Sequence, residues 1–154
     1  MPSAPPRSDM DPYAAGMAKG APVCRKRDVL GEMVVVLATR REGRGLQLIA
    51  PYTRAVARDE IHELIVTDET SAAPGRAVND VAYLGFAEIL QGGVIIVGDA
   101  VTIGSRFVGV IAGFDEAHMP NHQNVLIRAS ERRSGFELDL QCGDGVVIGS
   151  RRDG

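Results

Sequence analysis

The chain has 154 residues, 45% of them hydrophobic, and a formal net charge of −3. This composition fits one globular domain with its own core and excludes a disordered protein. Acidic and basic residues are interspersed, which argues against a nucleic-acid partner. No apolar run approaches the ~20 residues that cross a bilayer, and the N-terminus lacks the pattern of a secretory signal. We therefore expect a soluble, cytoplasmic protein with no membrane partner.

The N-terminal segment differs in composition from the rest of the chain. Residues 1–22 carry five of the eight prolines and show no apolar period. Such a segment buries too little surface to offset the entropy of ordering. We predict a disordered tail over 1–22 and one domain over 23–154. Cys24 and Cys142 form neither a Cys-x-x-Cys pair nor a disulfide framework, so a packing role is expected for them.

The first structured elements are expected to be strands. Residues 32–38 form a β-branched run of strand length, and 40–45 read as a turn because two glycines supply backbone freedom. A second strand at 46–51 is predicted to pair with the first as a hairpin. The segment 54–66 is ambiguous, since its first half could form a short helix.

Residues 61–67 favour a strand with a period of two. His62 then shares a face with Leu64 and Val66, whereas Glu63 lies on the opposite face. The polar connection 68–79 contains the turn signal Pro74-Gly75 and is long enough for a mobile flap. Strands are expected to resume at 81–90.

Two segments of the chain are nearly identical. Residues 98–106 read GDAVTIGSR and residues 143–151 read GDGVVIGSR. In each, a Gly-Asp turn is expected to change the direction of the chain, and the alternating Val and Ile side chains are expected to point into a core. Short strands with glycine turns predict a mostly β protein, a small antiparallel β-barrel or rolled sheet with at most one or two short helices.

The richest polar stretch is 114–122, FDEAHMPNH, which holds two of the three histidines beside two carboxylates. It lies between the apolar segments 107–113 and 124–128, and loops on rigid scaffolds often carry sites. Pro120 argues against a helical His-x-x-x-His metal motif. Pro120 and Asn121 suit the central positions of a tight turn, which would bring His118 and His122 together.

Two chemistries suit this loop. Neutral imidazoles could bind a divalent metal such as Zn, and His62 could join His118 and His122 from a neighbouring strand to complete the set. In a metal-free site, His118 or His122 would accept a proton while Asp115 or Glu116 orients it or acts as its acid partner.

A structural explanation also stays open. Asp115 would cap a turn, Glu116 would face water and the histidines would satisfy backbone groups. Weaker substrate-binding candidates are His62, Tyr83, Arg106 and Asn121. No nucleotide cofactor is indicated, because neither a Gly-x-Gly-x-x-Gly nor a P-loop sequence occurs between a strand and a helix.

The order of elements over residues 94–148 resembles the glucitol/sorbitol-specific IIA component of bacterial phosphotransferase systems. This order is a Gly-Asp strand, a Ser-Arg turn, the apolar run 107–113, a polar loop with Asn121-His122 and a returning strand. The resemblance implies a small β-barrel. The counterpart of that family's phospho-accepting strand, 81–90, contains no histidine here. The sequence GFDExHMPNH is also similar to a motif of small, poorly characterised bacterial proteins.

These observations lead to two functional hypotheses. The first is an acid/base enzyme of lyase, isomerase or cyclase type that acts on a small polar metabolite, with or without a metal. The alternative is a non-catalytic barrel that binds a small ligand or regulates a partner. A homodimer is expected in either case.

Overall fold

The structure, a computed structural model, describes residues 26–151. The predicted tail over 1–22 and Cys24 lie outside the described residues. Within them every regular element is a strand, and no helix there is long and apolar enough to span a membrane. The strands are β1 (Val29–Val36), β2 (Arg40–Arg41), β3 (Leu46–Gln47), β4 (Thr53–Val56), β5 (Ile61–Thr67), β6 (Ala77–Val78), β7 (Val81–Gln91), β8 (Gly93–Ile96), β9 (Ala100–Ile103), β10 (Arg106–Asp115), β11 (Asn124–Arg128) and β12 (Gly145–Gly149).

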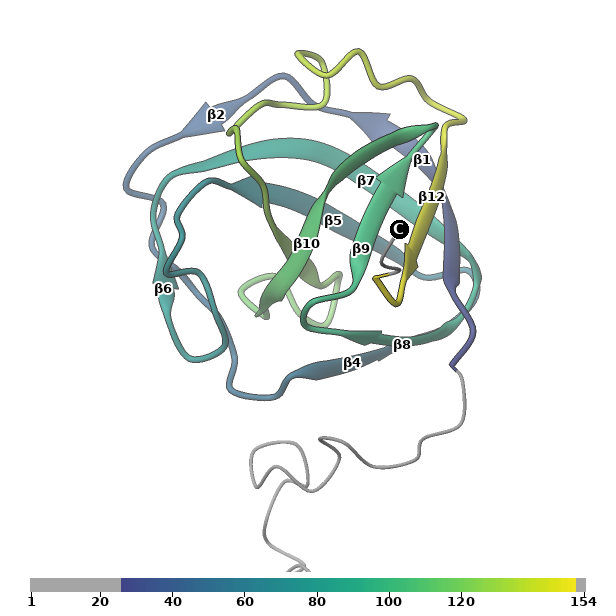
Figure 1. The fold of residues 1–154 in the computed structure, drawn as a ribbon, viewed down its shortest axis with the longest axis horizontal. Coiled ribbons are helices and arrows are strands. Elements are labelled where there is room, and N and C mark those ends of the chain that lie inside the picture. Colours follow the sequence, from purple (N-terminus) through teal and green to yellow (C-terminus); the bar gives the residue numbers. More distant parts are fainter. Residues whose placement is uncertain (1–25, 152–154) are drawn as a thin grey trace, which may run out of the picture.

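The main sheet closes into a ring. Its strand order is β1-β12-β9-β10-β11-β5-β7, and β7 pairs back onto β1, while β2 extends β7. All of these pairs are antiparallel except β11 with β5, which is parallel. Figure 1 shows the strands wrapped around a common centre. The predicted small β-barrel is confirmed.

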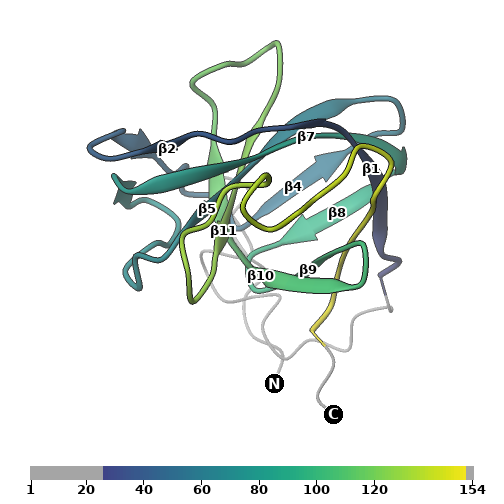
Figure 2. The ribbon, with the colours of Figure 1, turned by 90° about the horizontal axis from the view of Figure 1, so that it is seen from above.

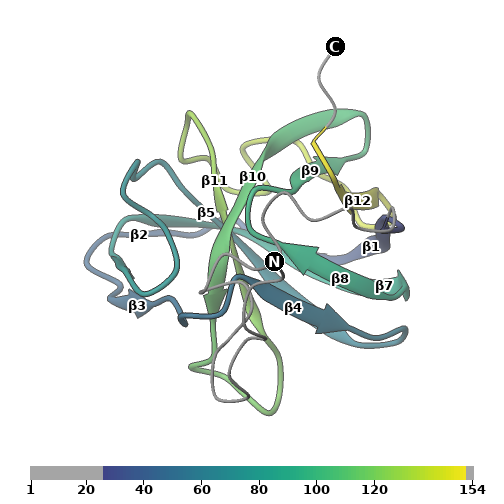
Figure 3. The same ribbon diagram turned by 60° about the horizontal axis from the view of Figure 1, so that its bottom comes forward.

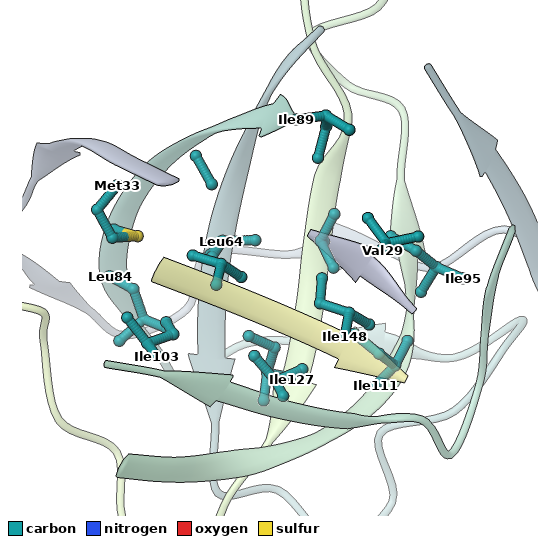
Figure 4. Packing of buried hydrophobic residues seen from close by; sticks show 14 of the residues in the cluster. Val29, Met33, Leu64, Leu84, Ile89, Ile95, Ile103, Ile111, Ile127 and Ile148 are labelled. Atoms are coloured by element: carbon teal, nitrogen blue, oxygen red, sulfur yellow. The ribbon is translucent and has the colours of Figure 1, made fainter. Parts of the chain in front are cut away.

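Apolar side chains fill the ring. Met33, Leu64, Leu84, Ile103 and Ile127 are all buried and come from different strands (Figure 4). The separate ribbon of β4 and β8 lies across one end of the ring (Figures 1 and 3) and adds Val56 and Ile95 to the same core. Burial of these side chains from water is the main driving force for closure of the barrel.

A second, smaller core lies on the other side of β5. Ile65 and Leu126 pack there with Leu46, Leu48 and Val78 from the segments around β3 and β6. Both faces of β5 are therefore buried, which a simple alternation of apolar and polar faces did not predict. The connection 68–79 is packed into this core through Ala72 and Val78, and the mobility of this segment stays a prediction.

The two near-repeats form the same structural device, as predicted. Gly98 and Gly143 have φ angles of 98° and 97°. Asp99 Oδ2 accepts the N–H of Ile96, and Asp144 Oδ2 accepts the N–H of Gln141, each at 2.9 Å. The repeats also pair with each other, because β9 and β12 are antiparallel neighbours. The repeats therefore meet about a local pseudo-twofold axis in the wall of the barrel.

Two of the predicted local elements are wrong. The strand at 46–51 does not form a hairpin with the first strand, because β3 pairs with β6 while β1 pairs with β12 and β7. The possible short helix in 54–66 is the strand β4, which pairs with β8. In both cases the partner comes from a distant part of the chain, which local pattern does not encode.

Candidate functional site

The loop 116–123 connects β10 to β11 and projects beyond the strands (Figure 2, light green). Asp115, only 4% exposed, holds its base. Its Oδ1 accepts the N–H of Ala117 at 2.9 Å and the side-chain amide of Asn124 at 3.0 Å, while Oδ2 accepts the N–H of Gln47 at 3.0 Å. Asp115 therefore caps the turn, which is the structural role that the sequence left open as an alternative to a catalytic one.

The tight turn in this loop is displaced by one residue from the prediction. The N–H of Asn121 donates to the carbonyl of His118 at 2.9 Å. The central residues of the turn are therefore Met119 and Pro120 rather than Pro120 and Asn121. The turn nevertheless brings the two histidines together, with ring centroids 5.0 Å apart and an angle of 29° between the rings.

Of the two histidines, His122 has the ring that is fixed by more contacts. Its ring meets Phe86 of β7 edge to face, with centroids 5.1 Å apart. Its Nδ1 lies 3.1 Å from Asn121 Nδ2, so Asn121 contacts the ring directly. Its Nε2 is buried and has no hydrogen-bond partner among the described residues. His118, by contrast, is exposed on the loop.

Glu63 of β5 is the group that faces His122. Its Oε1 lies 3.4 Å from His122 Nε2, and the residue is only 8% exposed. Burial raises the pKa of the Glu63 carboxyl, and attraction to His122 and His118 partly opposes that rise. The parallel pairing of β5 with β11 sets this contact, because it places Glu63 opposite Asn124 at the end of the loop.

His62 does not join this cluster. Its Nδ1 accepts the N–H of Gln123 at 3.0 Å, so the neutral ring carries its proton on Nε2, which faces Glu60 Oε1 at 3.0 Å. Hydrogen bonds from the N–H of Ala57 and from His62 lower the pKa of Glu60. Both nitrogens of His62 are therefore used, and the structure places Glu63, not His62, beside the two histidines.

A pocket of about 480 Å³ opens beside His122. The loop forms one wall, and β4, β7 and the start of β5 form the others. Its lining residues are Arg54, Asp59, Glu60, Ile61, His62, Phe86, Met119, Pro120, Asn121 and His122. The predicted substrate-binding residues His62 and Asn121 are thus at this pocket.

Other predicted residues lie elsewhere. Tyr83 packs against the second core, and Arg106 lies at the opposite end of β10 from the loop. Neither lines the pocket. Glu116 is exposed and pairs with Arg54 across the pocket rim at 3.2 Å, where a salt bridge contributes little to stability.

Comparison with known proteins identifies the family of this chain. A family model described only as a family of unknown function, DUF6917, matches residues 23–149. The chain belongs to this family. No curated protein and no solved structure matches the chain. The DUF6917 match contains the barrel, the loop and all the site residues described above, but its description carries no activity.

The residues that sequence reasoning missed are Glu63, Phe86, Arg54 and Glu60. Glu63 carried a usable signal, because it is a carboxylate within an otherwise apolar strand, where an ionised group is rarely buried without a partner. Phe86 and Arg54 carried no such signal in the sequence, because nothing in the local pattern of their strands marks them as site residues. Only their positions around the pocket distinguish them.

Replacing Glu63 with glutamine is expected to stabilise the fold at neutral pH in the presence of a chelator. The folded state raises the pKa of Glu63, so ionisation of this carboxyl costs stability above its unfolded pKa of ~4.3. The advantage of Glu63→Gln should therefore grow as the pH rises from ~4 and fade below it. Thermal melts across this range measure the effect, and each kcal/mol corresponds to about 2–4 °C in Tm.

Glu60→Gln is the matched control, because the pKa of Glu60 is shifted in the opposite direction. That variant should be less stable than the wild type at neutral pH and should approach it at low pH. If both variants shifted the melting curve in the same direction at every pH, burial of charge at Glu63 would not be the cause.

Proposed function

We propose that this protein is an enzyme that transforms a small polar metabolite by acid/base chemistry, in the manner of a lyase, isomerase or cyclase. One observation carries the proposal: His122 lies in the wall of a pocket with the buried carboxylate of Glu63 directly behind its Nε2. A carboxylate beside an imidazole orients the ring and stabilises its protonated form, which suits a group that moves protons.

The pocket fits this class of substrate in size and in lining. Its volume of about 480 Å³ lies in the range of ~300–1,000 Å³ that small-molecule sites occupy. Ile61, Phe86 and Met119 supply apolar contact. Arg54 and Asn121 supply polar groups that can fix the orientation of a bound molecule.

The roles of the residues follow from their contacts. His122 is the proton-transfer group and Glu63 is its partner, which replaces Asp115 and Glu116 in that role. Asp115 fixes the base of the loop, and His62 is a pocket wall whose ring is locked by Gln123 and Glu60. His118 stacks on His122 from the exposed side.

The proposal is tested by proton exchange with solvent, which can be followed before any product is identified. Pools of small polar metabolites are incubated with the protein in D₂O, and deuterium incorporation at carbon or formation of new products is followed by NMR and mass spectrometry. His122→Ala should lower the rate by about 10²–10⁴-fold, the usual contribution of a positioned acid or base. Glu131→Gln, on a different surface, serves as the control.

The alternative is a ligand-binding or regulatory barrel, related to the phosphotransferase IIA scaffold that the sequence resembles. It is favoured by the absence of a histidine in β7 and by the structural contacts of Asp115 and His62. Metabolites that raise the Tm of the wild type but show neither exchange nor conversion would support it and contradict the enzymatic proposal. The homodimer stays a prediction that sedimentation can check.

A further inference from the structure

We propose that Glu63, His118 and His122 bind one divalent transition-metal cation at the edge of this pocket. The proposal deepens the proposed function, since it concerns the same site. One potential ligand atom from each residue lies within 4.8 Å of the others. The three residues come from β5 and from the loop that follows β10, so the fold, rather than a local sequence motif, assembles the set.

The spacing of Glu63 and His122 is that of two ligands on one ion. Zinc lies ~2.0–2.1 Å from nitrogen and oxygen ligands, so two ligands at a tetrahedral angle are roughly 3.4 Å apart. The distance between His122 Nε2 and Glu63 Oε1 is 3.4 Å. This pair therefore already has the separation that a shared tetrahedral ion requires.

The ring nitrogen of this pair also lacks a hydrogen bond. His122 Nε2 is buried without a hydrogen-bond partner among the described residues, and the nearly buried Glu63 carboxylate faces it. A buried carboxylate without compensation is costly. A cation between Glu63 and His122 would compensate the carboxylate charge and satisfy the ring nitrogen at the same time.

The surroundings of His122 suit ligation through Nε2. A ligating histidine usually donates its other N–H to an oxygen, which fixes the ring. The side-chain amide of Asn121 lies 3.1 Å from His122 Nδ1, and the oxygen and nitrogen of such an amide exchange places by a simple flip. Asn121 could then accept a hydrogen bond from Nδ1–H of His122.

His118 completes the set from the solvent side. It is exposed and already stacked near His122, so a change of its rotamer adjusts the final distances without moving a strand. Two imidazoles and one carboxylate favour zinc, iron or nickel over magnesium or calcium. Three protein ligands also leave a coordination position open, as catalytic zinc sites do.

Metal binding changes which group moves the proton but not the class of reaction. In the loaded protein Glu63 and His122 would be ligands, and the base would be the hydroxide that remains when a water molecule on the cation gives its proton to solvent, because a bound divalent metal lowers the pKa of water to ~7. Of the three ligands, His122 lines the pocket, so the cation would lie at the edge of the space for a bound molecule.

The test is zinc binding by untagged, chelator-stripped protein, measured by isothermal titration. Serine replaces Cys24 and Cys142 in all proteins so that thiolates cannot account for binding. We expect one zinc ion per chain. Glu63→Gln, His118→Ala and His122→Ala should each weaken binding by at least about tenfold, since loss of an outer partner alone costs ~10–100-fold. Glu131→Gln, which removes a carboxylate on a different surface, should bind like the parent.

A second readout separates ligation from unfolding. Zinc should raise the Tm of the parent and of Glu131→Gln, but not that of the three ligand variants. Cobalt bound to the parent should show the visible absorption of a four-coordinate ion. The proposal is overturned if the parent binds no zinc, or if folded ligand variants bind zinc as tightly as the parent does.

The same proteins distinguish this proposal from the proposed function. Proton exchange by the stripped parent without any zinc binding would overturn the metal site and leave the enzyme proposal standing. Zinc binding that depends on the three ligands, with neither exchange nor conversion of any metabolite in the loaded protein, would support the metal site and contradict the enzyme.

Discussion

Replacing Asp115 with alanine is expected to destabilise the fold by about 3 kcal/mol or more and to release the loop that carries both clustered histidines. The carboxylate accepts hydrogen bonds from the N–H groups of Gln47 and Ala117 and from the side chain of Asn124. The side chain of Asn124 is buried and costs ~1–3 kcal/mol when left without a partner, and each of the two partly buried N–H bonds adds ~0.5–1.5 kcal/mol. Chemical denaturation measures the loss, and hydrogen exchange of residues 116–123 reports the release of the loop.

Glu116→Gln is the control for this variant, because it changes the neighbouring carboxylate. Glu116 is exposed and makes only the surface pair with Arg54, so its replacement should cost less than ~1 kcal/mol. Equal losses for the two variants, or unchanged exchange of the loop in Asp115→Ala, would contradict the anchoring role of Asp115.

Replacing Gly85 with alanine is expected to prevent folding. Gly85 lies in β7 where this strand pairs with both β1 and β5, and its φ angle is 145°. A Cβ at this position would stand 1.9 Å from the carbonyl oxygen of Val35. Because that oxygen belongs to the backbone of a paired strand, β1 would have to separate from β7. The expected cost exceeds ~4–5 kcal/mol, and circular dichroism of purified protein would show the loss of the β structure.

Substitutions at two other glycines distinguish the stability cost of steric overlap from that of backbone strain. Gly43 has a φ angle of 63° with nothing within 4 Å of an added Cβ, so Gly43→Ala should cost only ~1–2 kcal/mol of left-handed strain. Gly145 also has open space and no positive φ, so Gly145→Ala should be nearly neutral. A folded Gly85→Ala protein that is as stable as Gly43→Ala would contradict this prediction, because it would show that β1 can shift enough to accommodate the added Cβ.

Gly85 also bears on the site. The register of β5 with β7 is shifted just beyond Leu64 and Gly85, and the preceding pair is Glu63 with Phe86. Phe86 contacts the ring of His122, and Glu63 faces its Nε2. The close approach of β1 to β7 at Gly85 therefore helps to place Phe86 and Glu63 around the ring of His122.

Local sequence pattern determined the character of the strands well. The strand predicted at 61–67 has the bounds of β5, and the strand predicted at 81–90 is β7 with one more residue. The Gly-Asp repeats were recognised as one device, because positive φ at glycine and capping by the next aspartate are local properties. Pairing was not local, and the hairpin of the first two strands was wrong for that reason.

The candidate site divides in the same way. A rare cluster of histidines between two apolar runs marked the loop from the sequence alone. The partner of His122 depended on the parallel pairing of β5 with β11, strands that about 60 residues of chain separate. The alternation within β5 placed Glu63 away from His62, but it could not show which of these two residues faces His122.

The sequence by itself determined that this protein is built from strands, where its chain turns, and which loop holds its scarce histidines. These properties follow from backbone freedom, side-chain branching and alternation, which act over a few residues. The tertiary structure alone decided that β5 lies beside β11, that His62 is occupied by Gln123 and Glu60, and that Glu63 stands at 3.4 Å from His122. The reason is physical: closure of the ring selects strand partners by the burial of both cores together, a property of the whole chain that no single segment carries.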